Sequence, residues 1–116
     1  MIRTLKHHTK HGELIGQCGV DSGQILLSDP CYVKDFTDNE DFDGEQKAPY
    51  NYSYNGACSA TLKSHAGQLG AGLGVVVSSG YGDGSYPVYV QKNDEGRIIS
   101  ATIVFIDIET DEGEYE

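Results

Sequence analysis

Glycine spacing in the second half of the chain is the feature that most constrains the fold. Seven glycines lie between residues 67 and 84, and the last three belong to the segment Gly80-Tyr81-Gly82-Asp83-Gly84. Each glycine inside a helix costs about 1 kcal/mol relative to alanine, so a helix is disfavoured here. The segment predicts a tight turn with positive φ at two or three glycines, and we expect it to close a β-hairpin.

Short apolar segments separated by turn residues predict strands along most of the chain. Residues 13–28 have the pattern of a strand, a turn and a strand, ended by Asp29-Pro30 because proline cannot donate to a strand ladder. Residues 86–90 alternate, residues 93–96 indicate a turn, and residues 97–107, apolar throughout 103–106, are expected to form a central strand. Tyr50, Tyr52 and Tyr54 recur with a period of two, which predicts one face of a strand continued by residues 57–63.

These patterns predict an all-β fold, or a β-rich fold with at most a short helix, built as a single-domain antiparallel sandwich or small barrel. The best helix candidate, residues 61–70, is interrupted by Gly67 and Gly70. We expect residues 1–12 to form a flexible or edge-lying polar arm and residues 13–107 to form the domain. Residues 35–47 are expected to be an acidic surface loop, and residues 108–116 an acidic tail.

The charge balance limits the classes of partner. The 116 residues carry 8 lysines and arginines against 18 acidic residues, a net charge of −10, so direct binding to nucleic acid or to an anionic membrane is disfavoured. No apolar stretch approaches the roughly 20 residues of a membrane span, and the first residues lack a signal-peptide pattern. Three cysteines without a Cys-x-x-Cys spacing predict reduced thiols. We therefore expect a cytoplasmic protein, in the host cytoplasm if a phage encodes it.

Two segments resemble a known family. Residues 20–24 (VDSGQ) are followed by residues 29–32 (DPCY), and residues 80–89 (GYGDGSYPVY) are followed by residues 94–97 (DEGR). Together they are similar to the bacterial and phage family called domain of unknown function 4241 and to its shorter relatives, over roughly residues 14–34 and 72–107. The resemblance implies a compact β domain and implies no reaction.

No catalytic, metal or cofactor constellation stands out. Asn39, Asp41 and Asp43 alternate like calcium ligands, but the twelfth position of such a loop, which requires glutamate, is Tyr50. The histidines near the N-terminus lie on an arm that is too mobile for a preformed metal site. Cys31 or Cys58 with His65 are the only reasonable thiol and imidazole pairs, and Cys58 has the surroundings of an inert thiol. We therefore expect that the protein is not an enzyme and that it binds no metal ion and no cofactor.

The sequence instead favours a non-enzymatic accessory or binding protein of bacterial or phage origin. Its acidic, tyrosine-bearing surface is expected to contact a protein partner, as a phage inhibitor of a host or defence factor would. One alternative is a sponge for a small anionic ligand, a phosphorylated or cyclic nucleotide held by glycine amides, although Asp83 opposes an anion. A metal- or thiol-dependent hydrolase is the third class, and a homodimer through exposed strand edges stays open. The candidate contact residues are Tyr81, Gly82, Asp83, Gly84, Tyr86, Tyr52, Tyr54, Asp38, Asp41 and Asp43.

Overall fold

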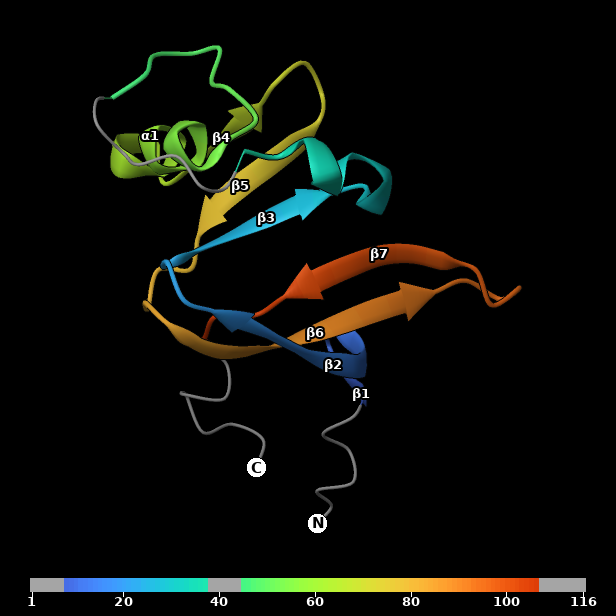
Figure 1. Cartoon of the computed structure of the whole chain (residues 1–116). Coiled ribbons are helices and arrows are strands. Elements are labelled where there is room, and N and C mark those ends of the chain that lie inside the picture. The colour runs from blue at the N-terminus through green and yellow to red at the C-terminus, as the bar shows by residue number, and fades with distance from the viewer. Residues whose placement is uncertain (1–7, 38–44, 107–116) are drawn as a thin grey trace. The chain divides into compact units, whose positions relative to one another are not determined.

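A computed structural model describes residues 8–37 and 45–106 (Figure 1). It is strand-rich, with 46% of residues in strands and 19% in helices, and its two small sheets are antiparallel. The β-rich prediction with one short helix is confirmed, and the described residues form no closed barrel. The chain divides into two compact units, unit 1 from residues 1–21 and 83–116, and unit 2 from residues 22–82.

The sheet of unit 1 has four strands in the order β1-β2-β6-β7. They span His8–Thr9, Gly12–Val20, Gly84–Lys92 and Ile98–Ile103. The turn between β6 and β7 falls at residues 93–96, as the sequence predicts. The Asn93 side-chain oxygen accepts from the amides of Glu95 (2.9 Å) and Arg97 (3.0 Å), and Gly96 has a φ of 83°. This turn is therefore encoded locally by an asparagine and a glycine.

The prediction of a central strand over residues 97–107 is wrong. β7 ends at Ile103 and lies at the edge of its sheet, with β6 as its partner. Just after the strand, Val104 donates to the Pro87 carbonyl at 3.1 Å, and the Phe105 ring meets the Tyr86 ring edge to face at 5.2 Å. The continuous apolar run thus reflects packing beyond the end of the strand rather than burial of both strand faces.

Unit 2 is a three-stranded sheet with one helix against it. The strand order is β3-β5-β4, with β3 at Gln24–Ser28, β4 at Ala66–Leu69 and β5 at Gly74–Ser78. The short 3-10 helix η2, Pro30–Asp35, follows β3, and the Asp29 carboxylate caps it by accepting from the Cys31 amide at 2.9 Å. Helix α1, Tyr54–Ser64, packs on β4 and β5 (Figure 1). No helix in the described part of the chain is long and apolar enough to cross a membrane.

Helix α1 overturns the prediction of a strand at residues 50–54 and of extended chain at 57–63. Tyr54 is the first residue of the helix, and the Ser53 hydroxyl caps it by accepting from the Gly56 amide at 2.9 Å. The buried face consists of small residues, including Ala57 and Ala60, so the sequence shows no apolar stripe of helical period. The helix approaches β4 closely, since a β-carbon at Gly67 would lie 3.0 Å from that of Ala60.

The two predicted hairpins are also wrong, although their turn chemistry is confirmed. β2 pairs with β6 and β3 pairs with β5, so residues 21–23 and 79–83 are connections from one sheet to the other. Gly80, Gly82 and Gly84 have φ values of 81°, 84° and 156°, as expected. A glycine with positive φ suits a connection between sheets as well as a hairpin, and the local sequence does not distinguish them.

Several predicted segments lie outside the described residues. These are residues 1–7 of the arm, residues 38–44 of the acidic loop and all of the tail at residues 108–116. Of the arm, His8 and Thr9 form the edge strand β1. The proposed division into arm, domain and tail stays a prediction.

Replacing Gly56 with alanine should destabilise unit 2, although alanine is the better helix former. A β-carbon at this position would overlap the Asn51 carbonyl oxygen and lie 2.9 Å from its carbon. We expect a loss of about 2 kcal/mol or more in the free energy of unfolding, measured by denaturant titration of the helical circular dichroism. Gly19→Ala is the control, because that site on β2 has open space around it. A Gly56→Ala protein as stable as the control would contradict the close helix packing.

Candidate functional site

The structure separates the residues predicted to form a contact surface. Tyr81 is 63% exposed, and Gly82, Asp83 and Gly84 beside it are also exposed. Tyr52 and Tyr86 are buried at 8% and 9% exposure. Asp38, Asp41 and Asp43 lie outside the described residues. The candidates therefore do not form one tyrosine surface.

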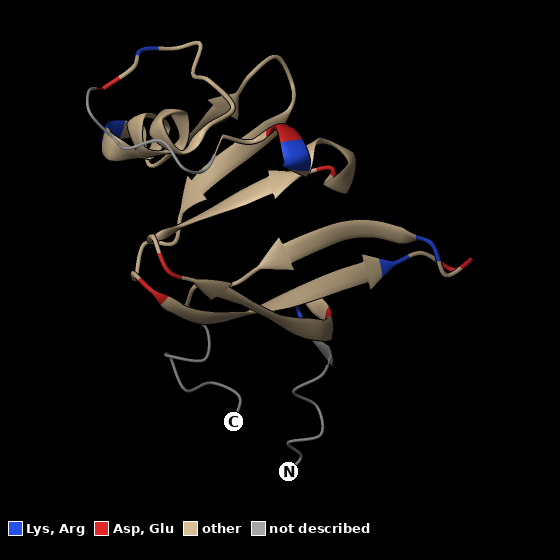
Figure 2. Ribbon diagram, in the orientation of Figure 1, with Lys and Arg blue, Asp and Glu red and all other residues tan. Residues whose placement is uncertain are grey.

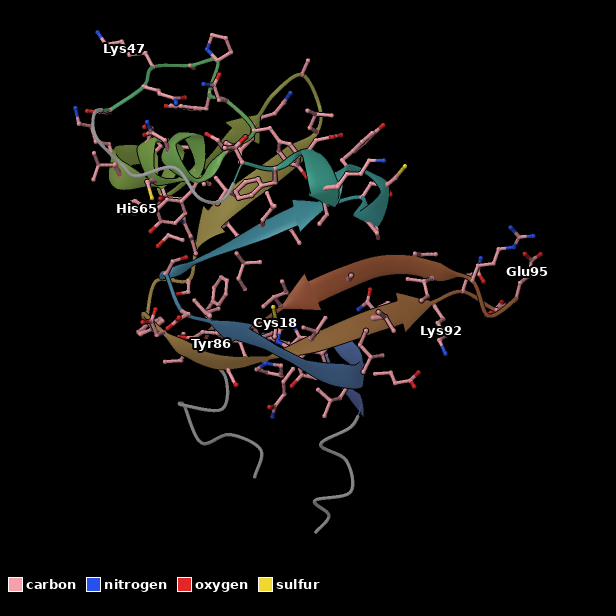
Figure 3. All side chains as sticks on the ribbon, viewed as in Figure 1. Cys18, Lys47, His65, Tyr86, Lys92 and Glu95 are labelled. Atoms are coloured by element: carbon pink, nitrogen blue, oxygen red, sulfur yellow. The ribbon has the colours of Figure 1, made fainter. Side chains whose placement is uncertain are left out.

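Tyr52 belongs to the core of unit 2. The single Ser28 hydroxyl proton is donated to the Leu73 carbonyl at 2.8 Å, so the Tyr52 hydroxyl is the donor in its 2.6 Å bond to Ser28. The Tyr52 ring stands edge to face with Phe36 at 5.2 Å. Tyr86 is buried in unit 1, where Figure 3 labels it on β6. Both rings stabilise cores, so a partner cannot use their faces without unfolding them.

Several polar groups in and beside the glycine-rich connection are already hydrogen-bonded to other protein groups. The Gly80 amide donates to the Ser78 hydroxyl at 3.3 Å, and the Ser79 hydroxyl donates to the Gly82 carbonyl at 2.8 Å. The Ser79 amide donates to the Gly23 carbonyl at 2.9 Å. An anion cradle would need converging amides, and two of these amides already have partners.

Tyr54 and Cys58 lie one helical turn apart on α1 and interact. The hydrogen bond to Cys58, then the electrostatic interaction with that residue, and last burial raise the pKa of the Tyr54 phenol above its ordinary value. The Gln24 side-chain amide also donates to the Cys58 sulfur at 3.6 Å, and the side-chain oxygen of Gln24 lies 3.1 Å from the Thr61 hydroxyl. The partners of Cys58 in the described chain are thus an amide and a phenol, rather than His65.

The described residues offer few other side chains that could form a reactive centre. All three cysteines are free, and Cys31 is exposed on η2. His65 is the exposed C-cap of α1 and adopts a left-handed conformation with a φ of 67° (Figure 3). Across residues 8–37 and 45–106, no three histidine, cysteine or acidic side chains are grouped so that they could hold a metal ion.

A groove on unit 2 brings together residues that the sequence analysis did not select. It has a volume of about 250 Å³ and lies between β3, η2 and the β4–β5 turn. Leu27 and Val75 are opposite each other on paired strands, so their side chains share one sheet face, while Leu26 and Val76 lie on the helix side. We call this feature the β3–β5 groove; its lining includes Leu27, Asp29, Tyr32, Gln68, Leu73 and Val75.

Large apolar side chains remain exposed in and beside the β3–β5 groove. Leu27 is 51% exposed, Val75 44%, Tyr32 40% and the neighbouring Val33 54%. Asp29 and Gln68 give it polar edges, and Figure 2 shows acidic and basic residues on η2 next to an uncharged β3 and β5. The sequence signal that could have revealed this groove is that β3 and β5 are each apolar at successive residues. Such a pattern indicates apolar side chains on both faces of the sheet, and helix α1 packs against one of these faces.

A second depression lies on the sheet of unit 1. It has a volume of about 360 Å³ and is lined by residues of β2, β6 and β7, including Glu13, Lys92 and Ile99. The Lys92 ammonium and the Glu13 carboxylate face each other at 3.3 Å, with both side chains nearly half exposed. This surface ion pair contributes little stability.

The fold and site define a small β-rich protein of two antiparallel units that carries an exposed apolar groove. The family model described as "Protein of unknown function (DUF4241)" matches residues 5–103, and the chain belongs to this family. The resemblance found in the sequence is thereby confirmed. Comparisons with curated proteins and with solved structures gave no match.

Replacing Cys58 with alanine should lower the pKa of Tyr54, because it removes the hydrogen bond and the electrostatic interaction that favour the neutral phenol. Since the folded-state pKa is raised, this interaction stabilises the fold below pH about 10 and is lost as the pH rises through the higher folded value. Ultraviolet titration of phenolate, with Tyr54→Phe to assign the signal, measures the change. Cys31→Ala is the control, and an equal effect of both cysteine variants would contradict the contact.

Proposed function

We propose that this chain is a non-enzymatic binding protein that holds a protein partner at the β3–β5 groove. The observation that carries the proposal is the group of four large apolar side chains, each 40–54% exposed, in and beside that groove. An exposed apolar patch with polar edges is typical of protein interaction sites. The groove volume of about 250 Å³ lies below the range of roughly 300–1,000 Å³ for small-molecule pockets. An inserted side chain of a protein therefore fits better than a nucleotide.

The partner is expected to be basic around an apolar anchor. The chain carries a net charge of −10, and Asp29 and Asp35 lie at and near the groove. Complementary charge speeds encounter and selects the partner, while apolar burial supplies most of the affinity. A factor whose basic surface normally holds nucleic acid has this chemistry. The proposal thus includes a role as an accessory protein of bacterial or phage origin that inhibits such a host or defence factor.

Leu27→Lys should abolish partner capture, because it places a charge in the centre of the apolar contact. We expect a fall of about tenfold or more in recovery of the partner from bacterial lysate, measured by quantitative mass spectrometry of immobilised protein. Leu62→Lys is the matched control, since it makes the same change at a leucine of α1 that is 53% exposed and does not line the groove. Both variants should keep the wild-type circular dichroism. Capture of the same proteins by wild type and Leu27→Lys would refute the groove as the binding site.

The acidic loop is tested separately. Changing Asp38, Asp41 and Asp43 together to asparagine should weaken capture and reduce its dependence on salt, because three carboxylates no longer attract a basic partner. Asp94→Asn with Glu95→Gln is the control, because it removes acids from the exposed β6–β7 turn of unit 1 (Figure 3). Equal recovery by the loop variant and the wild type at every salt concentration would remove the loop from the electrostatic argument.

A further inference from the structure

Strand β3 is an outer strand of the unit 2 sheet, and it is both regular and uncharged. Its residues, Gln24–Ser28, carry no charge, and all of them pair with β5 without a shift of register. Figure 1 shows β5 beside β3, with β4 beyond it, as the strand order requires. An outer strand of this kind is a template for pairing with an extended segment of another chain.

The other outer strands of the two described sheets are less suited to such pairing. β1 has only two residues. The pairing of β7 with β6 shifts register between Gln91 and Lys92, so the β7 ladder is irregular. The outer side of β4 is occupied where Tyr50 bridges Leu69 and accepts from the Gly70 amide at 2.8 Å. Of the outer strands in these sheets, only β3 combines a regular ladder with the β3–β5 groove beside it.

The hydrogen bond between the two connections shows which backbone groups of β3 point outward. The Ser79 amide donates to the Gly23 carbonyl at 2.9 Å, so residue 23 directs its backbone groups toward the side of β5. Backbone groups alternate between the two neighbours along an antiparallel strand. The odd-numbered residues of β3 therefore face β5, while Gln24, Leu26 and Ser28 direct their backbone groups to the outer side. No loop or turn in the described part of the chain forms a backbone hydrogen bond with Leu26.

The same alternation places the side chains of an added strand relative to the β3–β5 groove. A residue of that strand directly opposite Leu27 forms a pair without hydrogen bonds, in which the Cα atoms are about 4.5 Å apart and the side chains are close. Its side chain therefore lies on the groove face of the sheet, beside Leu27, which is 51% exposed. An aliphatic side chain at this position buries apolar surface that is otherwise in contact with water.

The carboxyl end of β3 is held in place and is acidic. The Ser28 hydroxyl donates to the Leu73 carbonyl at 2.8 Å and accepts from the Tyr52 hydroxyl at 2.6 Å. Asp29 follows, lines the groove and accepts from the Cys31 amide at 2.9 Å. An ordered edge loses little conformational freedom on binding, and in a chain of net charge −10 a cation beside Asp29 is favoured.

We propose that the partner contributes an extended segment that adds to β3 as a further antiparallel strand of the unit 2 sheet. Its alternate side chains face the groove, with a basic residue beside Asp29 followed by aliphatic residues opposite Leu27 and Ile25. The antiparallel direction is chosen because it is the more stable pairing per residue. The backbone of Leu26 contributes affinity, and the groove selects the side chains. This inference rests on the proposed function and adds the shape and sequence pattern of the partner.

A synthetic peptide with this pattern, acetyl-Lys-Thr-Val-Thr-Val-Thr-amide, tests the pairing on the unaltered protein. Methylation of the backbone nitrogen of its middle threonine removes the amide that faces Leu26, whereas methylation at its first valine removes one that faces away from β3. Isothermal titration calorimetry should show a dissociation constant raised about tenfold or more by the first change and less than about threefold by the second. Equal weakening by both changes, or no binding of the unmodified peptide up to millimolar concentration, would overturn the proposal.

A second peptide of the same composition tests the direction of the added strand. In acetyl-Val-Thr-Val-Thr-Lys-Thr-amide the lysine lies opposite the buried Ile25 instead of beside Asp29, so it should bind about tenfold or more weakly. Equal binding of the two peptides, or unchanged binding of the first to Leu27→Lys, would overturn the stated pairing. If the first peptide does not bind but capture from lysate still depends on Leu27, this inference fails and the proposed function stands. If capture is also independent of Leu27, both fail.

Discussion

The bond from the Ser79 amide to the Gly23 carbonyl lies where the two connections between the sheets run beside each other. On one side of it Val20 is opposite Gly84, and on the other Gln24 is opposite Ser78. The registers of β2 with β6 and of β3 with β5 can both form only if these two connections stay aligned with each other. Both family motifs, residues 20–24 and 80–84, fall here, so their glycines meet a backbone requirement before any requirement of binding.

The architecture of unit 2 explains why one face of its sheet keeps apolar side chains exposed. Its helix contributes small buried residues and approaches β4 where Gly67 leaves room. One short helix covers one face of the sheet, and the groove side keeps Leu27 and Val75 partly exposed. Apolar strands with a single covering layer leave surface that water disfavours, and binding a partner is the ordinary way to cover it. The β3–β5 groove is thus a consequence of the architecture of unit 2.

Unit 1 presents a different kind of surface. Its sheet has β7 at one edge, and its depression is lined by residues of β2, β6 and β7, among them the ion-paired Glu13 and Lys92. The β3–β5 groove belongs to unit 2, so the two surfaces share no lining residue.

The sequence alone determined the local features. It predicted strand-rich structure, the turn at residues 93–96, the end of β3 at Asp29-Pro30 and the positive φ of Gly82 and Gly84, because each depends on residues within a few positions of one another. Only the tertiary structure decided that the two glycine turns connect sheets, that Tyr54 begins a helix, that β7 is an edge and that Leu27 and Val75 line a groove. Those outcomes depend on contacts between residues far apart in the chain. Small residues such as Ala60 and Gly67 control how closely two elements approach, and a local sequence pattern does not show which distant element will be the neighbour.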